Sequence, residues 1–94
     1  MTINGVLSIS SAAVYICDNI NGSTITKMRF TNPRAYNLSL KLFISSRNET
    51  VDLYDLILDA GDTVSDNMEY DLKKGDKLIA SSSIGKTFYA ISIK

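Results

Sequence analysis

Apolar and polar residues alternate most strictly between Leu38 and Ser45. Four aliphatic side chains there are each separated by one residue: Leu38, Leu40, Leu42 and Ile44. Successive side chains of a β-strand point to opposite faces, so this pattern predicts a strand with one face in a core. Phe43 falls on the opposite, otherwise polar face. We predict that this outward aromatic side chain contacts a second subunit or another partner.

Weaker alternation predicts further short strands along the chain. They are expected at 12–17, 24–31, 50–58, 77–82 and 87–93. In the first of them, parity puts Val14 and Ile16 on one face, with Tyr15 and Cys17 on the other. Seven or eight short antiparallel strands without a significant helix predict an all-β fold, a small β-sandwich of immunoglobulin-like or jelly-roll type. We expect residues 12–94 to form this single domain.

One short phrase, L-x-x-G-D-x-aliphatic, occurs twice. It runs from Leu58 to Val64, with Gly61 and Asp62, and again from Leu72 to Leu78, with Gly75 and Asp76. Glycine adopts positive φ without steric cost, and a type I turn followed by such a residue closes a hairpin. We therefore predict positive φ at both glycines after type I turns, in three short strands folded back and forth.

The pattern of the first eleven residues predicts an arm or an edge strand rather than part of the sandwich interior. Ile3, Leu7 and Ile9 share one parity, and Gly5 argues against a helix. The segment is too short and too poor in turns to form its own hairpin. It either adds an edge strand to its own sandwich or pairs with a neighbouring subunit, and we slightly favour the second. In that case Ile3, Leu7 and Ile9 are partner-contact residues.

Composition removes most catalytic and metal-binding possibilities. The chain of 94 residues has no histidine, one cysteine (Cys17) and a formal net charge of zero. This excludes intramolecular disulfides, zinc sites built from Cys and His, and Ser–His–Asp triads. The zero net charge disfavours binding to nucleic acid or to an anionic membrane. No signal peptide or long apolar segment is evident, so we expect neither secretion nor a membrane span.

The order of these segments resembles a known family of proteins. The segments are Ala13-Val14-Tyr15-Ile16, Gly22 to Asn32, Leu38 to Ile44, Leu56 to Val64 and a final short hairpin. This order is similar to that of small β-sandwich structural proteins in the virions of tailed bacteriophages, namely capsid decoration proteins, head-fibre proteins and tail modules. The resemblance covers about Ala13 to Lys94.

The resemblance implies a non-enzymatic virion component that is assembled in the host cytoplasm and has no cofactor. It implies that the protein forms a homo-oligomer, for which a trimer is one option. It also implies contacts with other virion proteins such as the major capsid protein. The alternative is a β-sandwich module of a tail or fibre that binds a glycan or the host surface. Five tyrosines are the candidate residues for such a face: Tyr15, Tyr36, Tyr54, Tyr70 and Tyr89.

The charged residues are segregated along the chain. Eight acidic and no basic residues lie between Glu49 and Asp71, and all ten lysines and arginines lie outside this stretch. A calcium site would need clustered oxygen ligands, for which Asp59, Asp62, Asp66 and Asn67 are candidates. Their spacing matches no known calcium loop, so we favour pairing of acidic and basic segments across strands or subunits.

Overall fold

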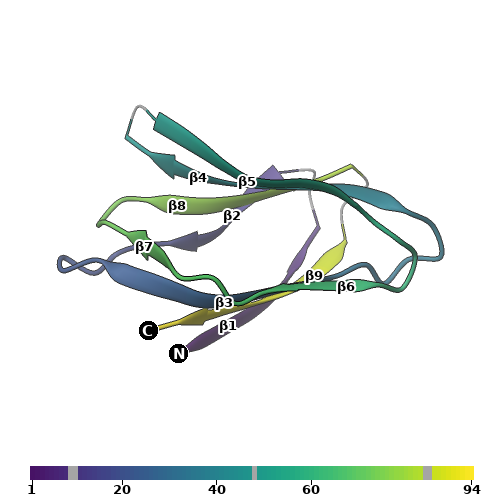
Figure 1. Ribbon diagram of the computed structural model, residues 1–94, viewed down its shortest axis with the longest axis horizontal. Helices are drawn as coiled ribbons and strands as arrows, with labels where there is room; N and C mark the ends of the chain where they lie inside the picture. Colours follow the sequence, from purple (N-terminus) through teal and green to yellow (C-terminus); the bar gives the residue numbers. More distant parts are fainter. Residues whose placement is uncertain (9–10, 48, 84–85) are drawn as a thin grey trace.

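The computed structural model describes residues 1–8, 11–47, 49–83 and 86–94, and within them the chain is all β (Figure 1). All paired strands are antiparallel. The strands are β1 (Thr2–Leu7), β2 (Ser11–Ile16), β3 (Ser23–Thr31), β4 (Leu38–Ser46), β5 (Glu49–Leu58), β6 (Thr63–Asp66), β7 (Tyr70–Leu72), β8 (Lys77–Ser82) and β9 (Thr87–Ile93). The predicted antiparallel sandwich without a helix is thus confirmed for the described residues.

The strands pair in a nested order. β4 pairs with its neighbour β5, β3 pairs with β6 and β7, β2 pairs with β8, and β1 pairs with β9. Alternate pairs fall in opposite sheets: sheet A has the order β1-β9-β3-β6, with β7 also on β3, and sheet B has the order β2-β8-β4-β5 (Figure 1). A long antiparallel ribbon rolled up in this way is a jelly roll. The structure therefore selects the jelly roll over the immunoglobulin-like alternative.

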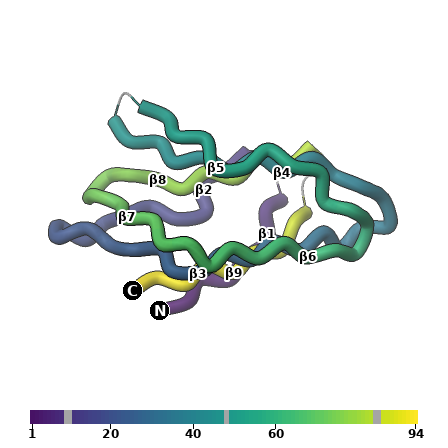
Figure 2. Tube along the Cα trace, viewed as in Figure 1, coloured from purple at the N-terminus to yellow at the C-terminus, as the bar shows by residue number. Residues whose placement is uncertain are grey.

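The core lies between the two sheets and is built from alternate residues of the long strands, with a change of parity where the register of β3 and of β5 shifts. Met28 and Phe30 point inward from β3, whereas Lys27 and Arg29 point outward. The aliphatic residues of β4 that were predicted to be buried also lie in this core, which leaves its polar residues on the outside. The molecule measures 41 × 26 × 20 Å, so the sandwich is two layers thick and elongated along its strands (Figure 2).

The β2 strand departs from simple alternation. Its register with β8 shifts between Ala13 and Tyr15. Such a bulge places an extra residue in one strand and reverses the parity beyond it. Val14 is consequently buried while Ile16 is exposed, and Cys17 is buried at the end of the strand. The prediction that Val14 and Ile16 share a face was wrong for this reason.

The two repeated phrases form corners between the sheets rather than hairpins. Gly61 lies between β5 of sheet B and β6 of sheet A, and Gly75 lies between β7 of sheet A and β8 of sheet B. We call the turns 59–62 and 73–76 the Gly61 corner and the Gly75 corner. The prediction of strands folded back and forth through them was wrong, because strict local alternation does not reveal which sheet a strand joins.

Both glycines have positive φ, as predicted: 75° at Gly61 and 94° at Gly75. Each corner is closed by a hydrogen bond from the amide of its fourth residue to the carbonyl of its first, 3.0 Å and 2.9 Å long respectively. Each glycine is therefore the third residue of its turn, and the second residue does not have positive φ. This is the type II pattern, so the predicted type I turn was wrong.

The two chain ends lie side by side at one end of the sandwich (Figures 1 and 2). The Met1 amino group donates a hydrogen bond of 3.0 Å to the Ile93 carbonyl. The Ile93 amide donates one of 2.7 Å back to the Met1 carbonyl. The pairing of β1 with β9 thus continues to the first residue.

Candidate functional site

The residues of the N-terminal segment that were predicted to contact a partner mostly face the chain's own core. Because β1 pairs with β9, the parity of Ile3 and Leu7 is the inward one. Leu7 is only 2% exposed, and Ile3 packs against the core. This corrects their assignment as partner contacts and makes β1 an edge strand of its own sandwich. Ile9 lies outside the described residues.

The outward parity of β1 was missed by the sequence reasoning. Val6 is 50% exposed and lies directly opposite Phe88 of β9, which is 42% exposed. The two side chains form an apolar pair on the outer face of sheet A. Alternation in β1 and β9 contains the signal, because Val6 and Phe88 hold apolar positions on the parity opposite to Leu7 and Ile91.

Beside Phe88, the outer face of sheet A has a shallow hollow of about 230 Å³. Residues from β1, β3 and β9 line it, among them Gly5, Arg29 and Ala90. Ala90 lies opposite Asn4 on one side and Arg29 on the other, so a small side chain occupies the middle of the sheet. The hollow is open to solvent and is bordered by one apolar and one cationic side chain.

Phe43 lies on the outer face of sheet B, where its parity placed it. It is half-buried there, between Ile79 of β8 and Asp52 of β5 in the register of the sheet. Ala13 of β2 continues the row beyond Ile79. Phe43 is therefore part of an apolar row across sheet B, and its contact with a partner stays a prediction.

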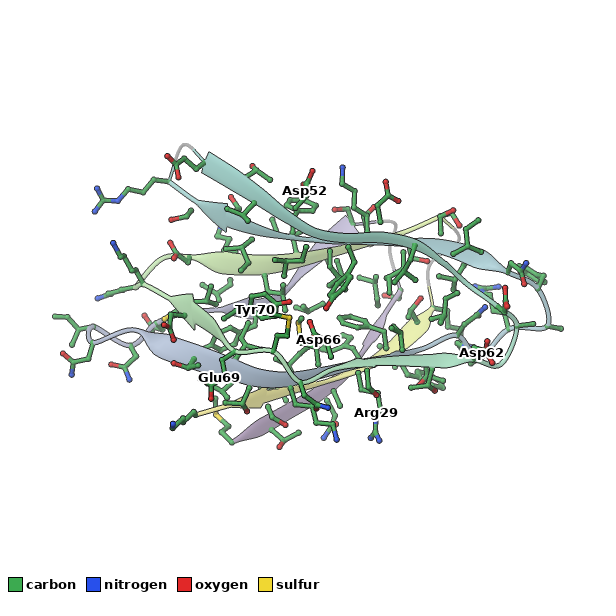
Figure 3. All side chains as sticks on the ribbon, in the orientation of Figure 1. Arg29, Asp52, Asp62, Asp66, Glu69 and Tyr70 are labelled. Carbon is green, nitrogen blue, oxygen red and sulfur yellow. The ribbon has the colours of Figure 1, made fainter. Side chains whose placement is uncertain are left out.

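The outer faces of the two sheets differ in the charges that they carry. Lys27 and Arg29 are exposed on β3 in the middle of sheet A. Asp52 and Asp55 are exposed on β5, which is an edge of sheet B. Figure 3 shows Arg29 and Asp52 pointing away from the sandwich on opposite sides. Within sheet B, Asp55 lies opposite Lys41, which agrees with the expected pairing of acidic and basic segments.

Three strands bring a polar cluster together at the open side of the sandwich. The Asp66 carboxylate of β6 accepts hydrogen bonds from the hydroxyl groups of Tyr54 (β5) and Tyr70 (β7), the latter 2.7 Å long. The amide of Met68 also donates to this carboxylate, at 2.8 Å. Asp66 and Tyr70 lie in the space between the two sheets in Figure 3. Since Tyr54 belongs to sheet B, the cluster ties the two sheets together.

Hydrogen bonding in this cluster favours the ionised form of Asp66. Burial by itself would raise the pKa of the Asp66 carboxyl, but the hydrogen bonds from Tyr54, Met68 and Tyr70 outweigh it and the pKa is lowered. Burial and the hydrogen bond to Asp66 raise the pKa of Tyr54. Burial raises the pKa of Tyr70 as well, together with its hydrogen bonds to Tyr54 and Asp66. The arrangement is a carboxylate held by two neutral phenols, which suits a structural role.

The five tyrosines do not gather on one surface. Tyr54 and Tyr70 point into the cluster, and Tyr89 packs against Phe30 with ring centroids 6.3 Å apart. The Tyr15 hydroxyl lies 2.7 Å from the hydroxyl of Ser23, whereas Tyr36 is exposed and lies beside Arg34. No glycan-binding aromatic face is formed by the described tyrosines.

The candidate calcium ligands lie in two places: Asp59 and Asp62 share the Gly61 corner, whereas Asp66 lies in the cluster with Tyr54 and Tyr70. Among the described residues, no group of three or more acidic, histidine or cysteine side chains is placed to hold a metal ion. Asp66 accepts hydrogen bonds from Tyr54 and Tyr70, and Asp62 is exposed at the Gly61 corner. Within the same residues, no helix is long and apolar enough to cross a membrane.

Comparison with known proteins finds likeness in structure but not in sequence. No protein-family model and no curated protein matches the chain. The chain is similar to a capsid structure of Helicobacter pylori bacteriophage KHP30, with a TM-score of 0.62 and 14% identity over 99% of this chain and 87% of that chain. It is also similar to the Drosophila NLP-core, described for pentamer formation and histone binding, with a TM-score of 0.61 and 10% identity over 100% and 96%.

A third structure is a pentameric capsid protein from metagenomic phage sequences. It has a TM-score of 0.55 and 14% identity, and the match covers 95% of this chain and 59% of that chain. At these identities the likeness establishes a shared fold. That fold occurs in chains of these two phage capsid structures and also in the Drosophila NLP-core.

Proposed function

We propose that this protein is a non-enzymatic structural subunit of a bacteriophage virion that acts through contacts with copies of itself and with the shell. The observation that carries the proposal is the match to the KHP30 capsid structure, which covers nearly the whole jelly roll and most of the other chain. The order of sequence segments independently resembles that of small virion proteins. Two separate lines of reasoning therefore favour the same class.

Self-association is supported by what the similar structures have in common. The NLP-core is described for pentamer formation, and the metagenomic phage protein is described as pentameric. A further match, with a TM-score of 0.55, is to Bacillus endospore appendages that form pili. Each of these proteins works as a repeated unit, and jelly rolls present two broad sheet faces that suit such contacts.

Within this class we propose an auxiliary role, as a capsid decoration or head-fibre protein with the major capsid protein as a partner. The exposed apolar side chains on both sheet faces, Val6, Phe88 and Ile57, provide surface for such contacts. A glycan-binding tail module receives less support, because the tyrosines that would form its binding face are separated in the structure.

The test is to look for the protein in particles. Phage particles are purified from a lysate made with the genome that encodes the chain, and their proteins are quantified by mass spectrometry. We expect the chain in a fixed ratio to the major capsid protein after density-gradient purification. A chain that is abundant in the lysate but absent from purified particles would overturn the proposal.

A further inference from the structure

The outer face of β5 carries a prominent apolar side chain. Ile57 is 69% exposed and lies opposite Ser39 near the end of the strand. Its neighbours along the strand, Leu56 and Leu58, point toward the core, so Ile57 projects outward from the edge of sheet B. Asp55, two residues away on the same face, is exposed as well. The feature is an isolated apolar projection with an acidic residue beside it.

The outer face of sheet A offers a hollow with basic side chains beside it. The hollow of about 230 Å³ over Ala90 has the Phe88 ring at one side and Arg29 at the other. Lys27 continues the cationic row on β3. An apolar side chain that enters this hollow gains contact with Phe88, and acidic residues next to it lie within reach of Arg29 and Lys27.

The hollow lies level with Arg29 in the sheet, because Ala90 of β9 pairs with Arg29 of β3. An apolar side chain seated over Ala90 is therefore one strand spacing, about 4.8 Å, from the position of Arg29.

We propose that these two faces dock in a head-to-tail contact between two copies of this chain. Ile57 of one copy occupies the hollow beside Phe88 of the next, and Asp52 and Asp55 face Lys27 and Arg29. Complementary charge favours a second copy as the occupant. Asp52 and Asp55 lie on the edge strand of sheet B, outside Lys41 of β4, whereas Lys27 and Arg29 lie on the opposite face of the same molecule. The inference rests on the proposed function and specifies its self-association.

A contact between two different faces has a consequence for the assembly. Each copy keeps one free face of each kind after the first contact, so addition continues until a ring closes or a filament grows. An isologous dimer made from two copies of sheet A would instead bring Lys27 and Arg29 of both copies together. The geometry thus distinguishes a head-to-tail assembly from a two-fold dimer.

The experiment is a reciprocal charge reversal, with the native mass measured by light scattering and by sedimentation over a range of concentrations. One variant carries Lys27→Glu and Arg29→Glu, and the other carries Asp52→Lys and Asp55→Lys. Each alone should raise the dissociation constant of self-association on the order of tenfold or more. Combining all four changes in one chain should restore assembly, because every contact again joins opposite charges. Mixing the two variants should restore the contact between unlike copies.

The matched control reverses a basic pair at the Gly75 corner, Lys73→Glu with Lys74→Glu, and should leave assembly as in the wild type. Circular dichroism and thermal melting confirm that each variant is folded. The apolar contact is tested by Ala90→Leu, which fills the hollow, and by Ile57→Ser, with Ile20→Ser as control at an 81% exposed isoleucine elsewhere. Both test variants should dissociate, whereas the control should not.

The outcomes separate this interface from the proposed function. Wild-type protein that assembles while every reversal variant also assembles overturns the interface and leaves the proposed function standing. Reversal variants that dissociate but whose assembly is not restored when all four changes are combined in one chain overturn the head-to-tail arrangement. Wild-type protein that stays monomeric at all concentrations overturns both the interface and the self-association, and the analysis of purified particles then decides the virion role independently.

Discussion

The Gly61 corner and the Gly75 corner share their sequence phrase and their place in the fold, yet they are held by different groups. Both carry the chain from one sheet to the other, and in both the carbonyl of the aspartate accepts a hydrogen bond of 2.9 Å from the amide at the end of an adjacent strand. That amide belongs to Asn32 at the Gly61 corner and to Cys17 at the Gly75 corner. The two corners therefore share this main-chain hydrogen bond, and at the Gly75 corner the glycine amide also donates to the Cys17 carbonyl at 2.8 Å.

The side chains that hold the two corners differ. At the Gly61 corner, the buried Asn32 amide group donates to the carbonyls of Tyr36, Leu58 and Asp59, at 2.9–3.1 Å. Asp62 itself is exposed. The phrase thus specifies the path of the main chain, whereas a residue from another part of the sequence stabilises it.

At the Gly75 corner, the aspartate of the repeated motif itself stabilises the turn. Asp76 is buried and accepts hydrogen bonds from the Lys73 amide at 2.9 Å and from the Ser46 hydroxyl at 2.7 Å. Cys17 occupies the place of Asn32 and makes only weak sulfur hydrogen bonds: its thiol lies 3.8 Å from the Leu72 carbonyl and 4.0 Å from the Asn19 carbonyl, and it accepts from the Ser23 hydroxyl at 3.1 Å. Asp62 and Asp76 hold the same position in the repeated motif, but only Asp76 stabilises its turn through side-chain hydrogen bonds.

The largest effect is expected from Asn32→Ala. The change leaves three carbonyl groups and the Arg34 amide without the partner that they have now. Unsatisfied buried polar groups are costly, so the free energy of unfolding should fall by about 3 kcal/mol. Urea denaturation measures it. Cys17→Ala at the equivalent position of the other corner should cost less, and an equal or larger cost would contradict the comparison.

An intermediate effect is expected from the two aspartates. Asp76→Asn weakens the charge-assisted hydrogen bonds from Lys73 and Ser46, and should lower the free energy of unfolding by about 2 kcal/mol at neutral pH. Asp62→Asn, the same change in the same phrase, should have an effect within about 0.5 kcal/mol because its side chain is exposed. Thermal melts of both variants give the comparison, and equal losses would refute it.

Acid should abolish the difference between wild type and Asp76→Asn. The hydrogen bonds from the Lys73 amide and the Ser46 hydroxyl lower the pKa of the Asp76 carboxyl despite its burial. A group whose pKa is lower when folded contributes its full stability above its unfolded pKa of about 3.9, and loses it as the pH falls through the folded value. The two melting curves should therefore converge below about pH 4. A constant difference down to low pH would show that charge is not involved.

A smaller effect than that of Asp76→Asn is expected at the glycines of the two corners. Gly61→Ala and Gly75→Ala should each cost about 1 kcal/mol, since an added methyl group meets no atom within 4 Å and only the positive φ is unfavourable. Gly22→Ala is the matched contrast: its φ is 80°, and the added carbon would lie 2.6 Å from the Leu72 carbonyl oxygen. Chemical denaturation should rank Gly22→Ala as the most costly of the three.

Local features of this fold were predictable from the sequence, and long-range ones were not. Strict alternation located β4 and its buried aliphatic residues, and the two glycines were recognised from their phrase. The partner of each strand was not predictable, because nested pairing joins residues as distant as Thr2 and Ser92. The bulge in β2 was missed as well, because one extra residue does not recognisably change the amino-acid composition of a strand.

In the candidate sites, too, local features were predictable from the sequence and long-range ones were not. The outward parity of Phe43 was predicted from its own strand alone. The cluster around Asp66 was not, because it needs Tyr54 and Tyr70 from strands of both sheets. The charge match between the two outer faces also required knowledge of which strand lies in which sheet. Arrangements of this kind depend on the tertiary fold.

The adjacent chain ends have a practical consequence for protein engineering. Because Met1 and Ile93 are hydrogen-bonded to each other, a short peptide could join the ends, and new ends could open at the exposed turn near Ile20. A cargo protein fused to either end would leave the sandwich from the same pole. In a closed ring of identical copies, all such cargo would be displayed on one side.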